Sequence, residues 1–390
     1  MSLIDASTVE RPPYVEQDRR NVEYTPIYWL SDAEAARHLD ATGAEYFTAI
    51  NPEGLEGVAE FVAKLRPLQE SLPRGGRLLS IGVGQGSELL ALGELFGDSA
   101  EILGADICQT ALDRAATNLD RAGVEANLIK ASATDLPFKE SDGTGVDGVV
   151  HSALLHEVYS YIPDGKLAFD QAAMSTARAL NEGGVWILRD FATPPEAARM
   201  IIFELKTEEA KDFYDYFRSR FRTFPDWDPG HKSQIKEQFD PQIAYPPLDA
   251  SGRVRLRYLD AAELMLHFRN YVDHTQRGLI ARRDAHWKEA DERYLIPHPG
   301  KDGLTPMPVY DYTTYVAGIA NAALEGTDFE IEVLQSETAP RPSTADFHRG
   351  HFGIYDEAGE RVPGAIESVP KKMELLFRKV RRNVSQMPSD

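Results

Sequence analysis

Cysteine is nearly absent from this sequence: Cys108 is the only one among 390 residues. A single thiol excludes an intrachain disulfide framework and any zinc or iron–sulfur site built on several thiolates. Long apolar runs are also missing, so we expect no membrane-spanning segment. Residues 1–10 lack the basic-then-apolar order of a secretory signal. These absences lead us to expect a cytoplasmic protein in which Cys108 is a small packing residue.

Basic residues are scarce relative to acidic ones. The chain has 42 Lys and Arg against 62 Asp and Glu, which gives a formal net charge of −20. Such a charge repels phosphate backbones and disfavours a nucleic-acid partner. Two basic clusters, at residues 253–257 and 378–382, have the character of solvated strand faces. The balance favours a small-molecule or protein partner.

The richest pattern in the chain is a short apolar run followed by alternating glycines. Residues 78–81 are too few for a helix, and Gly82, Gly84 and Gly86 follow them. This pattern predicts a buried strand, a tight turn open to a ligand, and a helix over residues 87–96 whose first N–H groups face that ligand. The alternative is an ordinary sharp turn from strand to helix.

A second strand-like run favours the ligand interpretation. Residues 101–106 end on Asp106, which stands about twenty positions beyond the last glycine. At that offset a carboxylate reaches the ribose hydroxyls in a βαβ nucleotide site. The two features together predict a nucleotide-type pocket.

Five stretches in order then resemble the motifs of the class I S-adenosylmethionine-dependent methyltransferases. They are residues 79–86, Asp106, and residues 131–138, 146–151 and 180–190. The resemblance implies an α/β fold, a doubly wound Rossmann-like seven-stranded sheet, with S-adenosyl-L-methionine as cofactor. Many members carry an acidic residue where Ser80 stands and an aspartate where Ser132 stands, so this chain departs from the pattern at two positions. The residues expected to bind the cofactor are Gly82, Gly84, Gly86, Asp106, Ile107, Ser132, Ala133 and His151.

The candidates for proton transfer are His156 and Asp190. Both follow expected strands at the edge where parallel α/β sheets bind their ligands. Histidine titrates near neutral pH, so His156 is suited to orient or deprotonate an acceptor, with Glu157 or Asp190 holding its other nitrogen. The alternative is that His156 packs a short helix and that methyl transfer needs only alignment of the reactants. Residues expected to contact the acceptor are Glu157, Tyr159, Arg189, Trp287 and Tyr294.

The predicted organisation has four parts. Residues 1–72 form an N-terminal helical segment and residues 73–195 the cofactor-binding core. After strand 5, residues 196–328 form a large, mostly helical insertion, interpreted as a cap that supplies most of the acceptor pocket. Residues 329–390 complete the core with the last two strands. No metal site is expected, because His348 and His351 have no carboxylate at matching spacing.

The leading functional hypothesis is a methyltransferase acting on a small molecule. One alternative is a methyltransferase acting on RNA or protein. A second is an NAD(P)-dependent oxidoreductase, although the glycines stand two apart where the dinucleotide fingerprint separates the last pair by three. A third is a non-catalytic scaffold that retains the cofactor fold. The oligomeric state does not follow from the sequence.

Overall fold

The computed structural model describes most of the chain between residues 58 and 382. The described ranges are 58–66, 75–156, 165–191, 199–220, 246–262, 309–339, 342–367 and 372–382, with a few single residues between them. The chain divides into two compact units.

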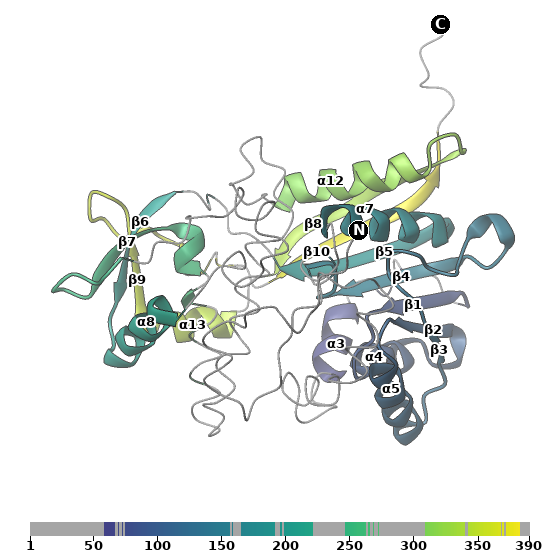
Figure 1. The fold of residues 1–390 in the computed structure, drawn as a ribbon, viewed down its shortest axis with the longest axis horizontal. Helices are drawn as coiled ribbons and strands as arrows, with labels where there is room; N and C mark the ends of the chain where they lie inside the picture. Colours follow the sequence, from purple (N-terminus) through teal and green to yellow (C-terminus); the bar gives the residue numbers. More distant parts are fainter. Residues whose placement is uncertain are drawn as a thin grey trace, which may run out of the picture. The chain divides into compact units, whose positions relative to one another are not determined.

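The first unit is built on a seven-stranded sheet in the order β3-β2-β1-β4-β5-β10-β8 (Figure 1). The pairs β1–β2, β1–β4, β2–β3 and β4–β5 are parallel. The expected doubly wound α/β fold is confirmed, and β10 lies between β5 and β8 although it comes last in the sequence. The strands are β1 (Arg77–Ile81), β2 (Glu101–Asp106), β3 (Asn127–Lys130), β4 (Val146–Ser152), β5 (Leu180–Phe191), β8 (Phe329–Ala339) and β10 (Lys372–Arg381).

Helices lie on both faces of this sheet (Figure 1). Residues of α3 (Val58–Leu65), α4 (Ser87–Phe96) and α5 (Gln109–Ala122) share one apolar cluster with β1, β2 and β4. On the other face are α7 (Gly165–Ala179) and α12 (Val309–Ala323), joined by an edge-to-face contact between Phe169 and Tyr312. The short 3₁₀ turns η3 (Gly97–Ser99) and η4 (Glu140–Asp142) lie in connections.

Strand β5 is longer than its sequence pattern predicts. A glycine pair ordinarily favours a turn, but Gly183 and Gly184 lie within the strand. Gly183 has φ 78°, and the pairing of β5 with β4 shifts register between Val146 and Gly148. A left-handed glycine accommodates such an irregularity without ending the strand, so the glycine pair bends β5 instead of preceding it.

The second unit contains a three-stranded antiparallel sheet in the order β7-β6-β9. Its strands are β6 (Met200–Leu205), β7 (Arg253–Arg257) and β9 (Phe352–Tyr355), and its helices are α8 (Glu208–Arg220) and α13 (Pro342–His351). The described part of residues 196–328 contains α8 and α12 together with β6 and β7, so the insertion adds two strands to the helices that the sequence predicts. Buried and half-buried residues alternate along β6, which is the period of a strand.

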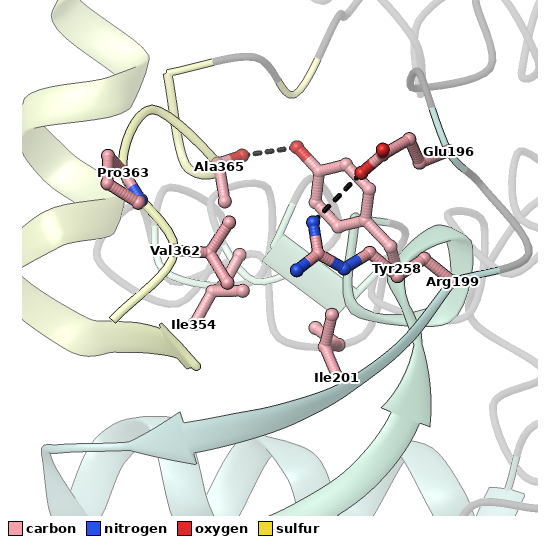
Figure 2. A pocket seen from close by; sticks show the side chains of 8 residues that line it. All are labelled: Glu196, Arg199, Ile201, Tyr258, Ile354, Val362, Pro363 and Ala365. Atoms are coloured by element: carbon pink, nitrogen blue, oxygen red, sulfur yellow. Dashed lines mark hydrogen bonds and ion pairs between the residues drawn. The ribbon is translucent and has the colours of Figure 1, made fainter. Parts of the chain in front are cut away.

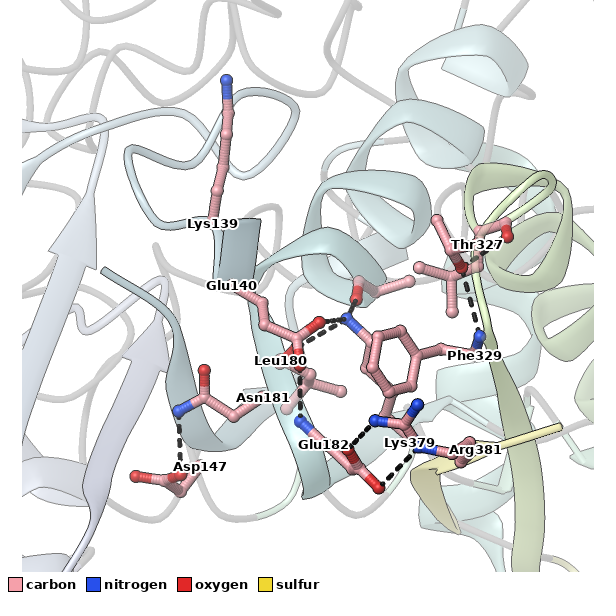
Figure 3. A network of polar contacts seen from close by, with 12 residues as sticks. Lys139, Glu140, Asp147, Leu180, Asn181, Glu182, Thr327, Phe329, Lys379 and Arg381 are labelled. Carbon is pink, nitrogen blue, oxygen red and sulfur yellow. Dashed lines mark hydrogen bonds and ion pairs between the residues drawn. The ribbon is translucent and has the colours of Figure 1, made fainter. Parts of the chain in front are cut away.

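A buried cation lies at the start of β5 in the first unit (Figure 3). The side chain of Lys379, on β10, is 2% exposed, and its Nζ lies 2.8 Å from Oε2 of Glu140. The same ammonium donates to the carbonyl oxygens of Leu180 at 2.7 Å and Ala177 at 3.3 Å. It also lies 5.1 Å from the centre of the Phe329 ring. Lys379 thus connects β10 to the end of α7, where a cation also complements the helix dipole.

Candidate functional site

The three glycines after β1 form the predicted turn. Gly82, Gly84 and Gly86 have φ angles of 74°, 51° and 86°, in the left-handed region that favours glycine. Space is also short: a Cβ added at Gly82 would lie 2.7 Å from Cδ1 of Leu154, and one at Gly86 would lie 3.2 Å from Cα of Ala115. Backbone conformation therefore favours glycine at all three positions, and packing against the Ala115 backbone adds to this at Gly86.

Asp106 connects this turn to the end of β2. Its Oδ2 accepts a hydrogen bond from the Gly84 N–H at 3.1 Å, and its Oδ1 accepts one from the Cys108 N–H at 2.9 Å. Each carboxylate oxygen can accept a second hydrogen bond, and the residue is half-buried. A glycine turn beside a partly accessible carboxylate is the geometry that the predicted ribose contact of Asp106 requires, and that contact stays a prediction.

The other predicted cofactor residues follow neighbouring strands at the same edge. Ile107 is half-buried directly after β2. Ser132 and Ala133 follow β3, whose last residue Lys130 pairs with Asp106 in the sheet. The Ser132 hydroxyl accepts the Thr134 N–H at 3.2 Å, which holds a short turn. The structure thus brings these three residues to the carboxyl ends of β2 and β3.

An acidic group near the turn was missed by the sequence analysis. The Ser80 hydroxyl donates to Oε1 of Glu88 at 2.7 Å, and both residues are buried. Ser80 stands where many methyltransferases carry an acid, and here the carboxylate comes from the first turn of α4. Acidic residues favour this helix position, but sequence alone gave no sign that Glu88 faces inward.

His156 and Asp190 form a buried pair. His156 Nδ1 lies 2.6 Å from Oδ1 of Asp190, and the side chains are 4% and 1% exposed. The backbone N–H of His156 also donates to Oδ2 of Asp190 at 3.1 Å. A carboxylate that accepts from Nδ1–H leaves the lone pair of a neutral imidazole at Nε2. Asp190 therefore fixes the orientation of the His156 ring.

The ring of His151 is buried in a different way. It packs edge-to-face on Trp186 with centroids 5.6 Å apart, and within the described part of the chain neither ring nitrogen has a hydrogen-bond partner. Burial lowers the pKa of His151 to about 3, partly opposed by the nearby Asp190 carboxylate. His151 is therefore neutral at physiological pH. Its backbone pairs with Ile81, one residue before the glycine turn.

We expect His151→Phe to protect the protein against acid. Because the folded pKa is about 3 and the unfolded value is near 6.5, the unfolded state binds more protons, and stability falls as the pH drops below 6.5. At pH 5 this costs about 2 kcal/mol. Urea denaturation at pH 7.5 and pH 5 should show a smaller pH effect in His151→Phe, which keeps the ring contact with Trp186. An equal effect in both proteins would assign the acid sensitivity to other groups, such as the His156–Asp190 pair.

The predicted acceptor residues are only partly described. Arg189 is buried, and its Nε donates to Oε1 of Glu374 at 2.9 Å. Glu157, Tyr159, Trp287 and Tyr294 lie outside the described residues. Within the described ranges no group of three His, Cys, Asp or Glu side chains is arranged to hold a metal ion. No described helix has the length and apolar character needed to cross a membrane.

Comparison with protein families finds a match for the part of the chain that contains the glycine turn. The family described as "Methyltransferase domain" matches residues 78–184, which include the glycine turn, Asp106, Ser132, Ala133 and the His156 segment. None of the curated proteins matches the sequence.

Several solved structures resemble the chain at low identity. A S-adenosylmethionine-dependent methyltransferase from Aquifex aeolicus has 16% identity and a TM-score of 0.32, covering 38% of this chain and 73% of its own. A S-adenosylmethionine-dependent methyltransferase from Clostridium acetobutylicum has 11% identity and a TM-score of 0.37, covering 87% and 98%. The sugar N-methyltransferase KedS8 from a Streptoalloteichus species has 20% identity and a TM-score of 0.30, covering 43% and 61%. At these values the substrates of those proteins do not transfer to this chain.

Proposed function

We propose that this chain, whose residues 78–184 match a methyltransferase domain, transfers the methyl group of S-adenosyl-L-methionine to a small-molecule acceptor with His156 as the proton acceptor. The observation that carries this proposal is the buried His156–Asp190 pair. His156 follows β4, and Asp190 is the penultimate residue of the neighbouring β5, so both lie at the carboxyl ends where parallel sheets bind ligands.

Methyl transfer from S-adenosylmethionine needs few catalytic groups from the protein. S-adenosylmethionine supplies an activated methyl group when bound, and the cofactor would be held by the glycine turn, Asp106 and the residues after β3. The chain's own contribution is to align the acceptor and remove its proton. Asp190 fixes the His156 ring so that Nε2 is the nitrogen that accepts this proton. If the acceptor atom carries no proton at working pH, His156 has a positioning role only.

The surface charges support a small acceptor over RNA. The arginines of β7 form the most regular basic stripe in the described ranges, and each pairs with a carboxylate. Arg253 contacts Glu204 at 2.9 Å, Arg255 contacts Glu357 at 2.5 Å, and Arg257 contacts Asp260 at 2.8 Å. Cations neutralised in this way contribute little to binding a phosphate backbone. That residues 196–328 supply most of the acceptor pocket stays a prediction.

The acceptor class can be tested directly. The protein is incubated with S-adenosylmethionine carrying a radiolabelled methyl group and, separately, with mixtures of small metabolites, total RNA and total protein. Label recovered in the small-molecule fraction is the expected result. Label confined to RNA or protein would replace the proposed acceptor class, and tight NAD(P)H binding without S-adenosylhomocysteine binding would overturn the proposal as a whole.

We expect Asp106→Ala to weaken S-adenosylhomocysteine binding by about 1–3 kcal/mol, the cost of losing a charged hydrogen-bonding partner. Asp106 also accepts a hydrogen bond from the Gly84 N–H, so the same variant loses a hydrogen bond that holds the glycine turn. Asp106→Asn keeps one carbonyl oxygen that can accept from Gly84, but it loses the charge and the acceptor for the Cys108 N–H. Calorimetric titration should therefore rank affinity as parent, then Asn, then Ala. Equal affinity of all three would remove Asp106 from the cofactor site.

A further inference from the structure

The second unit contains a small pocket that the proposed methyl transfer does not use. It has a volume of about 190 Å³, below the range of about 300–1,000 Å³ typical for drug-sized ligands. Residues of β6, β9 and the segment after β9 line it (Figure 2). The lining residues are Glu196, Arg199, Ile201, Tyr258, Ile354, Val362, Pro363 and Ala365.

The pocket has an apolar interior and one charged pair. Ile201 and Ile354 come from adjacent strands and are buried. The hydroxyl of Tyr258 is already used, because it donates to the carbonyl oxygen of Ala365. Burial raises the pKa of Tyr258, with Glu367 and Glu196 adding to the effect, so its hydroxyl stays neutral. The charges that line the pocket belong to Glu196 and Arg199.

Those two charges are accessible and held side by side. Arg199 Nη1 lies 2.9 Å from Oε2 of Glu196, and the side chains are 40% and 66% exposed. An exposed ion pair of this kind stabilises a protein very little, so a ligand can displace it at low cost. Each charge can then take a ligand group of opposite sign.

The backbone at Glu196 is strained to present its carboxylate there. Glu196 has φ 56°, a left-handed conformation that residues other than glycine rarely adopt. Its carbonyl oxygen accepts the Arg199 N–H at 2.8 Å, which closes the turn between the two residues. Strained residues of this kind concentrate at ligand-binding sites. Glycine would fit this backbone better, and glutamate supplies the charge.

We propose that this pocket binds an aliphatic α-amino acid as its zwitterion. Its carboxylate pairs with Arg199, its ammonium pairs with Glu196, and its side chain lies against Ile201, Ile354 and Val362. A simple carboxylic acid would place its anion beside Glu196, and a simple amine would place its cation beside Arg199. Only a ligand with both charges satisfies both residues, and the volume admits a small one.

The proposal is tested by calorimetric titration of the full-length protein with L-leucine, N-acetyl-L-leucine and L-leucinamide. Leucine should bind saturably, whereas each analogue lacks one charge and should bind about tenfold more weakly or worse. Equal affinity for N-acetyl-leucine and leucine would overturn the zwitterion assignment. No saturable leucine binding would overturn the site.

Three variants locate the ligand. Glu196→Gly removes the carboxylate and relieves the backbone strain, so it should weaken leucine binding about tenfold without lowering the melting temperature. Arg199→Ala should weaken binding to a similar extent. Lys211→Ala is the control, because it breaks another pair three residues apart, with Glu208 at 2.6 Å, in the same unit. Unchanged affinity in both pocket variants would overturn the proposal. S-adenosylhomocysteine affinity, measured on the same samples, separates this failure from failure of the methyltransferase proposal.

Discussion

Replacing His156 with Asn should lower turnover by about 10²–10⁴-fold, the usual contribution of a general base, while the protein stays folded. The amide nitrogen of Asn can occupy the place of Nδ1 and donate to Asp190, which lies 2.6 Å from that atom in the parent protein. What the variant lacks is Nε2, the atom that takes the proton. S-adenosylhomocysteine affinity should not change.

His156→Ala is a poorer test of this role. It leaves the Asp190 carboxylate, 1% exposed, without its ring partner, and removing one member of a buried pair typically costs about 3–5 kcal/mol of stability. Loss of activity would then follow from unfolding. Melting temperatures of both variants distinguish the two effects. Near-normal turnover in His156→Asn would show that methyl transfer needs alignment alone and that His156 serves packing.

Removing the partner of Lys379 should also lower the stability of the protein. In Glu140→Ala, the Lys379 ammonium remains buried at 2% exposure without its counter-ion. Since Glu140 is 27% exposed and water can partly replace it, we expect a loss of about 3 kcal/mol, at the low end of the range for buried pairs. Urea denaturation measures this directly.

Lys379→Met should cost less than Glu140→Ala, because it removes the charge and keeps the apolar stem. It still loses the hydrogen bonds to Ala177 and Leu180. The double variant should resemble Lys379→Met alone, since no unpaired charge remains. Arg381→Ala is the control, because its pair with Glu182 is exposed, at 58% and 49%, and should change the urea midpoint little. Identical midpoints for Glu140→Ala and Arg381→Ala would contradict this account.

The strands and helices around the glycine turn of the first unit were predictable because the sequence patterns that specify them are local. Helix α4 has the predicted bounds, and β2 ends at Asp106 as expected. Glycines at fixed offsets and apolar residues at helical or strand spacing act within a few positions of the chain. The contact between Asp106 and Gly84 follows from the same βαβ geometry.

Features that depend on distant segments were not predictable in this way. The antiparallel sheet of the second unit pairs β6 with β9, which lies about 150 residues later. Asp190 and Glu157 were both reasonable partners for His156, and the tertiary structure selected Asp190. Glu88 needed the inward orientation of α4, which sequence does not reveal. The pocket of the second unit also brings together residues 196–201 and residues 354–365, which are distant in the sequence.

The position of β10 in the sheet has a consequence for folding kinetics. Strand β8 joins the sheet only through β10, and β10 is the last strand in the sequence. Strands β1 to β5 can therefore assemble early, with β5 as an open edge, while completion waits for a segment beyond residue 370. Contacts of such large sequence separation slow folding, and an open edge promotes aggregation. We expect refolding to populate a five-stranded intermediate whose lifetime is set by the docking of β10.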